Sequence, residues 1–162
     1  MEPLTPDHVQ AALDQTGLGI HVQYMSQPTA TAPEAAAALN TELGSIVKSL
    51  LFMVDGQPTV VLTAGDQKVD DKKLSELYTV TRKKIKIATA EECIRIIGFA
   101  PGGLSPVGHR TPNLPILIDD TLARYETVYA AAGAANTIFP IKFQQLIDIT
   151  GGRVVSVVKE QV

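Results

Sequence analysis

Residues 46–63 read Ile-Val-Lys-Ser-Leu-Leu-Phe-Met-Val-Asp-Gly-Gln-Pro-Thr-Val-Val-Leu-Thr, and they carry the strongest structural signal in the chain. Two runs rich in branched apolar residues, Ile46–Val54 and Thr59–Thr63, flank the turn-forming sequence Asp55-Gly56-Gln57-Pro58. Such runs around a short polar turn are typical of two antiparallel strands. The stretch therefore predicts a β-hairpin.

Outside the hairpin, short strand and helix patterns follow one another without regular alternation. Strands are expected over residues 21–25, 85–88, 115–118, 128–132, 137–139 and 154–158. Helices are expected over residues 5–17, 35–39, 70–77, 89–97 and 141–147, the second of them with a capping box from Thr31 to Glu34. Because strands outnumber helices, we predict an α+β fold, in which helices surround a mixed, curved or barrel-like β-sheet.

Length and composition fit one soluble domain that spans residues 1–162. The chain is 45% hydrophobic and has a net charge of −3, so no overall positive field draws it to DNA or RNA. One cysteine excludes an internal disulfide, and no apolar run approaches the ~20 residues that cross a bilayer. The start of the chain lacks the basic and apolar regions of a secretory signal. We therefore expect a cytoplasmic protein without a membrane role, and a monomer.

Lys48 is the first residue that suggests chemistry. In a strand it shares a face with apolar residues such as Ile46 and Leu50, where an unpaired ammonium group is costly to bury. From spacing alone, a lysine that reaches water at a strand end is slightly favoured. The alternative is a cation that awaits a phosphate, carboxylate or ester carbonyl. Ser49 points to the opposite face and is interpreted as a small filler.

The segment Gly98-Phe99-Ala100-Pro101-Gly102-Gly103-Leu104-Ser105-Pro106-Val107-Gly108-His109 is the second suggestive feature. Its glycines allow backbone N–H groups to approach a ligand, and its prolines fix the shape of the loop. Such a loop suits a carbonyl or a developing oxyanion, although a tight crossover between elements would have the same composition.

Three segments in this order resemble the signature segments of the YbaK/ProX-type aminoacyl-tRNA deacylases. They are Val47-Lys48-Ser49-Leu50-Leu51-Phe52, Gly98-Phe99 with Gly102-Gly103-Leu104-Ser105-Pro106-Val107-Gly108, and Leu117-Ile118-Asp119. The resemblance extends from about the second strand to the last helix. It implies the α+β fold of the editing domain associated with prolyl-tRNA synthetase.

The resemblance also implies a function and a set of site residues. These enzymes remove a wrong amino acid from tRNA without a metal, a cofactor or a covalent nucleophile. Lys48 would be the required side chain, and the loop residues Gly102, Gly103, Ser105, Pro106 and Gly108 would line the pocket for the aminoacyl group and terminal adenosine. Asp119 would support the pocket. Lys48 would bind a phosphate or polarise the ester, and the amides of Gly102 and Gly103 would face the carbonyl oxygen.

The implied partners are the 3′ acceptor end of an aminoacyl-tRNA and prolyl-tRNA synthetase. In the branch that clears cysteine, a serine, two glycines and an aspartate follow the strand near Val128, whereas this chain has Ala130-Ala131-Ala132-Gly133. The difference fits equally a branch that clears alanine, a similar small amino acid or a non-protein analogue. The expected substrate is thus tRNA-Pro carrying a small wrong amino acid such as cysteine or alanine. A non-catalytic module that binds a tRNA end, a synthetase or a nucleotide-like ligand is the alternative.

Other chemistries have weaker support. His8, His21 and His109 are scattered and lack neighbours at metal-ligand spacing. His109 adjoins the pocket loop and is counted with the substrate-binding residues, although an exposed loop histidine is favoured over a general base.

The remaining candidates have structural interpretations. Cys93 among branched residues is typical of a core thiol, and Asp70-Asp71 and Asp119-Asp120 fit helix caps. The basic run Arg82–Lys86 could touch the acceptor stem, but a solvated surface is slightly favoured.

Overall fold

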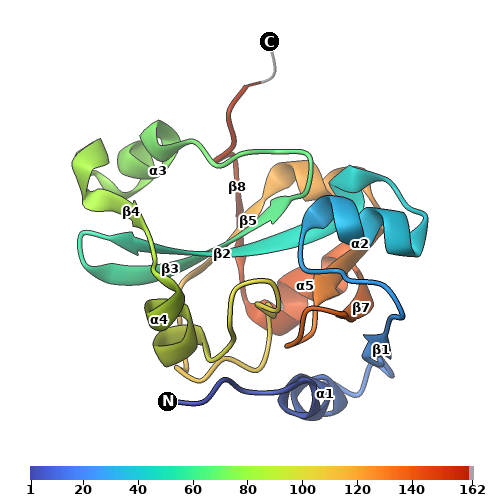
Figure 1. Cartoon of the computed structure of the whole chain (residues 1–162). Coiled ribbons are helices and arrows are strands. Elements are labelled where there is room, and N and C mark those ends of the chain that lie inside the picture. The colour runs from blue at the N-terminus through green and yellow to red at the C-terminus, as the bar shows by residue number, and fades with distance from the viewer. Residues whose placement is uncertain (161–162) are drawn as a thin grey trace.

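The computed structural model describes residues 1–160, which fold into a single α+β domain around one curved sheet (Figure 1). The strands are β1 (Gln23–Tyr24), β2 (Ile46–Val54), β3 (Gln57–Ala64), β4 (Ile85–Ile87), β5 (Ile116–Asp119), β6 (Thr127–Ala131), β7 (Thr137–Lys142) and β8 (Arg153–Val155). They pair in the order β1-β7-β6-β2-β3-β5-β8, and β4 pairs with β2 beside this path. The pairs β2–β6, β3–β5 and β5–β8 are parallel and the others antiparallel, so the sheet is mixed. This confirms the predicted α+β class with a mixed sheet, which is open and not closed into a barrel.

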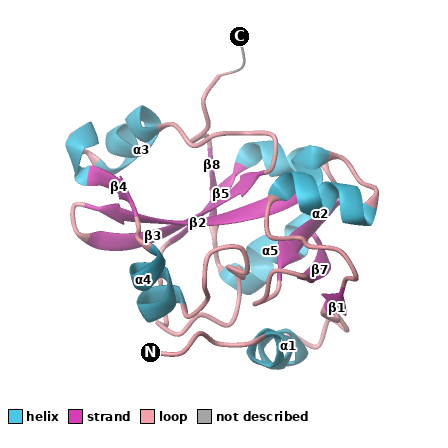
Figure 2. Ribbon diagram, in the orientation of Figure 1, coloured by secondary structure: helices cyan, strands magenta, loops and turns pink. Residues whose placement is uncertain are grey.

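Five helices surround the sheet (Figure 2): α1 (Pro6–Asp14), α2 (Ala32–Leu39), α3 (Asp71–Tyr78), α4 (Ala90–Glu92) and α5 (Phe143–Thr150). The predicted caps are present: Thr31 Oγ1 accepts from the Glu34 amide while the Glu34 carboxylate accepts from the Thr31 amide, and Asp70 caps α3. Residues 93–97 extend α4 as a π-helical turn, and the Arg110 side chain binds the Ile94 carbonyl there. The predicted helix over 89–97 thus changes its winding from Cys93 onward, in the turn that also binds Arg110.

The predicted hairpin is formed by β2 and β3, which lie at the centre of the sheet. Asp55 and Gly56 both have positive φ, which is the geometry of a tight two-residue turn, so β3 begins at Gln57 and not at Thr59. Two predicted strands elsewhere are shorter than expected by two or more residues. Residues 21–25 contribute only β1, and β8 ends at Val155, because Val158 makes an isolated bridge to Val69 instead of continuing the ladder.

Alternate residues of the hairpin enter two separate cores. Val47 and Leu51 join the larger core, to which α1 contributes Val9 and Leu13. On the other face Phe52 and Val54 pack with Leu74 of α3. Burial on both faces fixes the register of β2, because a one-residue slip would exchange the two sets of side chains.

Candidate functional site

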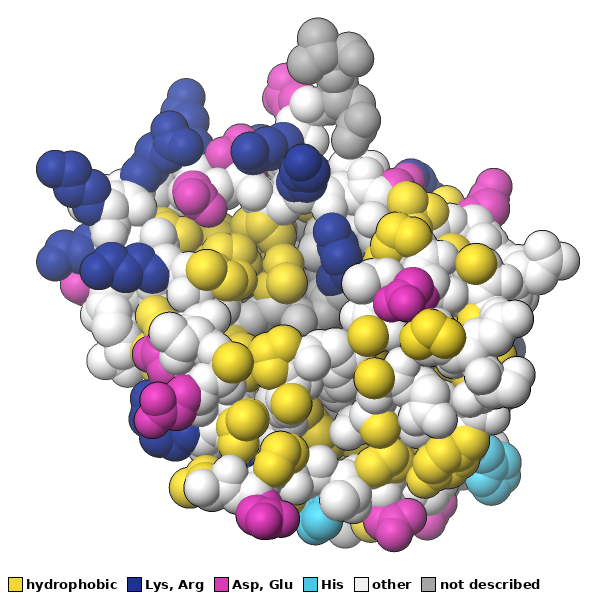
Figure 3. All heavy atoms as spheres, in the orientation of Figure 1, with side chains coloured by type: hydrophobic (Ala, Val, Ile, Leu, Met, Phe, Trp, Pro, Cys, Tyr) yellow, Lys and Arg dark blue, Asp and Glu magenta, His cyan; other side chains and the backbone are white. Residues whose placement is uncertain are grey.

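A cavity of about 440 Å³ lies beside the first half of β2, and Figure 3 shows this face hollowed between hydrophobic side chains. The walls come from four segments that are distant in sequence: the loop into α2 with α2 itself, β2 with the turn after β3, the 98–109 loop, and β6 with β7. The lining residues are Thr29, Ala30, Thr31, Ala32, Pro33, Ala35, Ile46, Val47, Lys48, Ser49, Leu50, Gly65, Pro101, Gly102, Leu104, Ala131 and Ile138. Small side chains dominate, so the walls favour a small apolar group.

Lys48 contributes the cation of this cavity. Its half-buried side chain donates from Nζ to the Gln67 carbonyl oxygen at 2.7 Å. The salt bridges formed among residues 1–160 are Lys84–Asp55 and Arg124–Asp66, so no carboxylate in this part of the chain lies within 4.0 Å of Lys48 Nζ. Burial lowers the pKa of Lys48, as does nearby Lys68, while Asp66 and then Asp119 oppose the shift. The ammonium group is therefore held without a directly bound anion.

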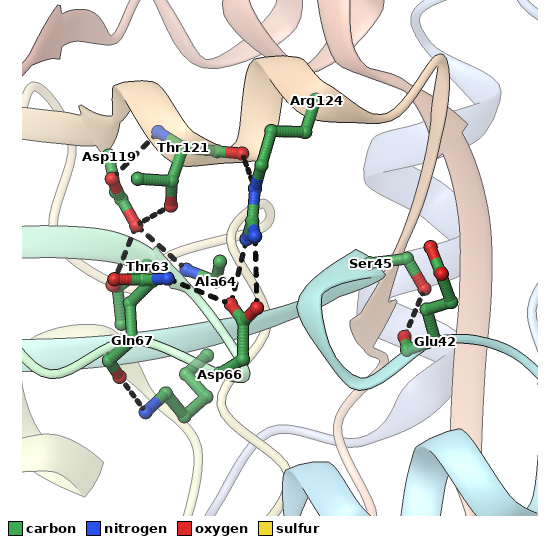
Figure 4. A network of polar contacts seen from close by, with 10 residues as sticks. Glu42, Ser45, Thr63, Ala64, Asp66, Gln67, Asp119, Thr121 and Arg124 are labelled. Carbon is green, nitrogen blue, oxygen red and sulfur yellow. Dashed lines mark hydrogen bonds and ion pairs between the residues drawn. The ribbon is translucent and has the colours of Figure 1, made fainter. Parts of the chain in front are cut away.

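Asp66, the carboxylate with the largest effect on the pKa of Lys48, is already bound to Arg124. Asp66 receives two hydrogen bonds from the Arg124 guanidinium, at 2.7 and 2.9 Å, and Arg124 Nε donates to the Thr121 carbonyl at 2.6 Å (Figure 4). The hydrogen bonds from Arg124 lower the pKa of Asp66. This two-pronged pair fixes the turn after β3, and Asp66 acts on Lys48 through space without forming an ion pair with it.

Asp119 is fully buried behind the same turn and supports it. Its carboxylate accepts hydrogen bonds from Thr63 Oγ1, the Ala64 amide, and both the amide and the hydroxyl of Thr121, at 2.6–3.1 Å (Figure 4). These donors satisfy the charge and join the ends of β3 and β5. Asp119 does not line the cavity, so its position fits support of the pocket and not contact with a ligand.

The 98–109 loop contributes residues to the walls of two separate cavities. Gly102 lies on the cavity wall, but Gly103 is buried against the backbone of Gly133 and Ala134, where a Cβ atom would lie 2.8 Å from the Gly133 carbonyl carbon and the Ala134 nitrogen. The Gly103 amide donates to the Ala100 carbonyl at 3.1 Å. In this structure the amide that was expected to face an ester oxygen closes the loop's own turn.

Ser105 is fully buried, and its hydroxyl accepts from the Val107 amide. Pro106, Gly108 and His109 line a second cavity of about 390 Å³ between the loop, α1 and α5. His109 is half-buried and not exposed as expected, and its Nε2 lies 2.8 Å from the Ser105 carbonyl oxygen. Burial lowers its pKa, partly offset by the Ser105 carbonyl. The structure thus brings Lys48 and Gly102 together and places Pro106, Gly108 and His109 elsewhere.

Ser49 is the residue that sequence reasoning undervalued. Its hydroxyl is buried on the cavity wall and has no hydrogen-bond partner, the one such side-chain atom among the buried polar groups of residues 1–160. The interpretation as a filler explains its burial but not its unpaired oxygen. A serine within a strand of apolar residues was the available signal.

The other candidates have structural roles. Cys93 is buried, which raises the pKa of its thiol and makes it a poor nucleophile. His8 contacts Thr5 at the start of α1. Within residues 1–160 no three His, Cys, Asp or Glu side chains gather in a way that could hold a metal ion. No helix of this part of the chain has the length and apolarity to cross a membrane.

A family model of the aminoacyl-tRNA editing domain matches residues 26–149, which include β2, the cavity and the 98–109 loop. The chain belongs to this family. A tRNA-editing role follows for the domain. The match leaves α1 outside its limits, although α1 packs against the core and against the second cavity.

Similar proteins agree with this editing domain assignment. An uncharacterised protein of Bacillus subtilis, YwhH, is 28% identical over 127 residues, which cover 78% of each chain. Proline–tRNA ligase of Staphylococcus aureus is 36% identical over 77 residues, which cover 48% of this chain and 13% of the ligase. A crystal structure assigned provisionally as a trans-editing enzyme for prolyl-tRNA synthetase has a TM-score of 0.88 and 36% identity, over 96% of this chain and 97% of the other.

Proposed function

We propose that this editing domain is a trans-acting aminoacyl-tRNA deacylase. It hydrolyses the ester that joins a small wrong amino acid, such as cysteine or alanine, to the 3′ end of tRNA-Pro. Prolyl-tRNA synthetase, which would produce the mischarged tRNA, is its functional partner. The domain acts as a cytoplasmic monomer. The observation that carries the proposal is the Lys48 ammonium, which lies without a bound carboxylate on a cavity with small apolar walls.

The cavity walls support a small amino acid as the group that is removed. Ala30, Ala35, Ala131 and Gly102 offer little that could hydrogen-bond a side chain, so selection rests on size. Apolar pockets discriminate by about 1–3 kcal/mol per methylene group, which excludes larger amino acids better than it separates alanine from cysteine. The domain therefore accepts more than one small residue.

The chemistry requires little from the protein, because an aminoacyl ester is already activated. Water attacks the ester carbonyl carbon, the bond to the ribose oxygen breaks, and a proton passes to that oxygen, which leaves free amino acid and tRNA with an intact terminal hydroxyl. Lys48 stabilises the negative charge that develops on the carbonyl oxygen or holds the terminal phosphate. The Asp66–Arg124 pair keeps the turn that carries the Gln67 carbonyl in place, so the Lys48 ammonium has a fixed position.

Deacylation of tRNA-Pro charged separately with cysteine, alanine, serine, threonine and proline tests the proposal. Purified wild type is expected to release one or more small amino acids and to leave prolyl-tRNA intact. Lys48→Ala is expected to reduce kcat/KM at least 100-fold, because removing a donor to a developing oxyanion typically has an effect of that size. The matched control is Lys159→Ala, which removes an exposed lysine outside the cavity and leaves the rate unchanged.

Circular dichroism of both variants shows whether the fold is retained. Equal rates for wild type and Lys48→Ala would remove Lys48 from the mechanism. A wild-type protein that binds charged tRNA but releases no amino acid would identify a binding module instead of an enzyme.

A further inference from the structure

The edge of β2 that faces the cavity is interrupted for a short distance. β6 pairs with β2 at Ile46 and Val47, whereas β4 pairs with it at Phe52–Val54. The Ala88 amide donates to the Leu51 carbonyl and extends the second pairing by one residue. Between these two neighbours no strand of residues 1–160 lies beside β2 on this edge.

Ser49 is the residue whose backbone faces that gap. In an antiparallel strand, the N–H and C=O of one residue point to the same edge, and successive residues alternate between the two edges. The Ile46 carbonyl accepts from Gly65 beyond β3, and the Leu51 carbonyl accepts from Ala88 on the opposite edge. Odd-numbered residues of β2 therefore face β6 and β4. Val47 and Leu51 have partners there, and within the described part of the chain Ser49 has none.

The Ser49 side chain adds a third polar group without a partner. Ser49 is 7% exposed, and its hydroxyl oxygen has no hydrogen-bond partner among the described residues. A buried unsatisfied hydroxyl destabilises a protein by about 1–3 kcal/mol, so its presence on a cavity wall indicates that a ligand completes it. The backbone N–H, the backbone C=O and the side-chain hydroxyl of Ser49 together form a candidate ligand-binding site.

We propose that Ser49 holds the amino acid part of the substrate, which sits in the gap as a single residue of an added strand. The ester carbonyl oxygen accepts from the Ser49 amide, and the α-ammonium group donates to the Ser49 carbonyl and hydroxyl oxygens. This is the exchange of two hydrogen bonds that one residue makes with its partner across an antiparallel pair. The inference rests on the proposed function, since it concerns the aminoacyl group of that substrate.

The charges of the cavity agree with this orientation. Lys48 and Ser49 are adjacent in β2, so their side chains leave the strand on opposite faces. The substrate ammonium is repelled by the Lys48 ammonium, which is the charged group of the cavity lining, and is therefore better placed on the Ser49 side. The positive charge of Lys48 remains for the ester or phosphate end.

A pair of substrates isolates the contact with the ammonium group. Alanyl-tRNA and propionyl-tRNA differ only in the α-amino group, and the propionyl ester is the smaller of the two. We expect Ser49→Ala to lower kcat/KM for alanyl-tRNA about 10- to 100-fold, mainly through KM, because a hydrogen bond to a charged group has about that strength. For propionyl-tRNA the rates of wild type and variant are expected to agree within about twofold.

A matched serine separates this role from a structural one. Ser75 in α3 is also buried, but its hydroxyl donates to the Lys72 carbonyl, far from the cavity lining. Ser75→Ala is expected to lower the melting temperature and leave kcat/KM unchanged. Ser49→Ala is expected to keep or raise the melting temperature, because it removes an unsatisfied group.

A Ser49→Ala effect of equal size on both esters, or no effect on alanyl-tRNA, would overturn the inference. If wild type hydrolyses no ester, the proposed function fails, and the contact is then decided by binding alone. The probes are the alanyl and propionyl amides of 3′-amino-3′-deoxyadenosine, which cannot be hydrolysed as esters. If Ser49→Ala weakens binding of the alanyl amide but not of the propionyl amide, the contact between Ser49 and the ammonium group is supported. If wild type and Ser49→Ala bind the alanyl amide equally well, that contact is refuted.

Discussion

At the scale of single residues, the site depends on Lys48 and Ser49, which are adjacent in β2. Lys48 is a charge kept partly out of water, and Ser49 carries a buried hydroxyl; among residues 1–160 the first has no bound anion and the second no hydrogen-bond partner. Both arrangements oppose folding, because charged and polar groups lose hydration when they are buried. Their presence side by side on one cavity wall is therefore easier to explain by ligand binding than by stability.

The lowered pKa of Lys48 predicts a pH dependence. A rate that requires the Lys48 ammonium group declines as the pH rises through the pKa in the folded protein, which lies below that of an ordinary lysine. An arginine at position 48 stays charged at alkaline pH. The ratio of the catalysed to the uncatalysed rate is therefore expected to stay constant for Lys48→Arg at the pH values where the same ratio falls for wild type. Rate profiles from pH 7 to 10.5 measure this difference. Profiles of the same shape for both proteins would show that Lys48 ionisation does not limit the rate.

The lowered pKa of Lys48 also affects the stability of the fold. Because the unfolded chain holds the Lys48 proton more tightly than the folded one, this group opposes folding at neutral pH and ceases to do so above the ordinary lysine pKa. Loss of activity in Lys48 variants is therefore not expected to be accompanied by loss of stability.

Sequence reasoning found Lys48 but could not evaluate Ser49. A lysine inside an apolar strand is visible as a pattern, and the family resemblance strengthened it. Whether Ser49 has backbone partners depends on where β4 and β6 pair with β2. These strands lie some 40 and 80 positions away in the sequence, so the local sequence around Ser49 does not encode that pairing. The same limit applies to Gly103, which is buried against the backbone of Gly133 and Ala134, some 30 positions away in the sequence.

At the scale of elements, local signals served well where one segment determines its own structure. The hairpin and the helix caps at Thr31 and Asp70 were predicted because turn residues and caps act over a few positions. Strand limits were less accurate, since β1 and β8 end where their neighbours in the sheet end. The division of the 98–109 loop between two cavities was not predictable, because α1 and the 132–136 turn determine it from outside the loop.

The contact of Gly103 with the 132–136 turn gives a prediction for this loop. A methyl group at Gly103 meets the Gly133–Ala134 backbone at 2.8 Å, so Gly103→Ala must displace the loop and Gly102 with it. We expect a stability loss of about 1–3 kcal/mol, as overpacking typically causes, together with a reduced kcat/KM. Urea unfolding and deacylation assays measure the two effects.

Gly56→Ala provides the control for that variant. Gly56 has positive φ, unlike Gly103, and its Cβ position has no atom within 4 Å, so the substitution strains one turn outside the cavity lining without displacing a neighbour. It is expected to reduce stability and to leave kcat/KM unaltered. Proportional losses of activity in both variants would show that stability alone, and not the position of the loop, controls the rate.

At the scale of the whole molecule, positive charge is concentrated on one side. Half of the 14 Lys and Arg residues occur between positions 68 and 86, and Figure 3 shows dark-blue side chains gathered over α3 and β4. They are Lys68, Lys72, Lys73, Arg82, Lys83, Lys84 and Lys86. In the fold, the basic run of the sequence therefore joins a larger surface that reaches the site at Lys68, whose charge acts on Lys48. This arrangement suits the phosphates of an acceptor stem.

The triple variant Lys72→Glu, Lys83→Glu, Lys86→Glu tests whether tRNA uses this surface. All three side chains are exposed and remote from the cavity lining. We expect kcat/KM for charged tRNA to fall about tenfold or more at low salt and to depend less steeply on salt concentration, since each lost phosphate contact lowers the logarithmic slope by about 0.7–0.9. Hydrolysis of 3′-aminoacyl adenosine, which has no stem, serves as the control and remains unchanged. Equal salt slopes for variant and wild type would identify a solvated surface.

The interrupted edge of β2 has a further consequence, for aggregation. An unpaired strand edge can act as a template on which another polypeptide adds a strand, and proteins protect such edges by shortening or covering them. Within residues 1–160 the unpaired backbone on this edge is limited to Ser49, bounded by β6 on one side and by Ala88 and β4 on the other. The opening that can receive one amino acid is thus too short to receive a second chain.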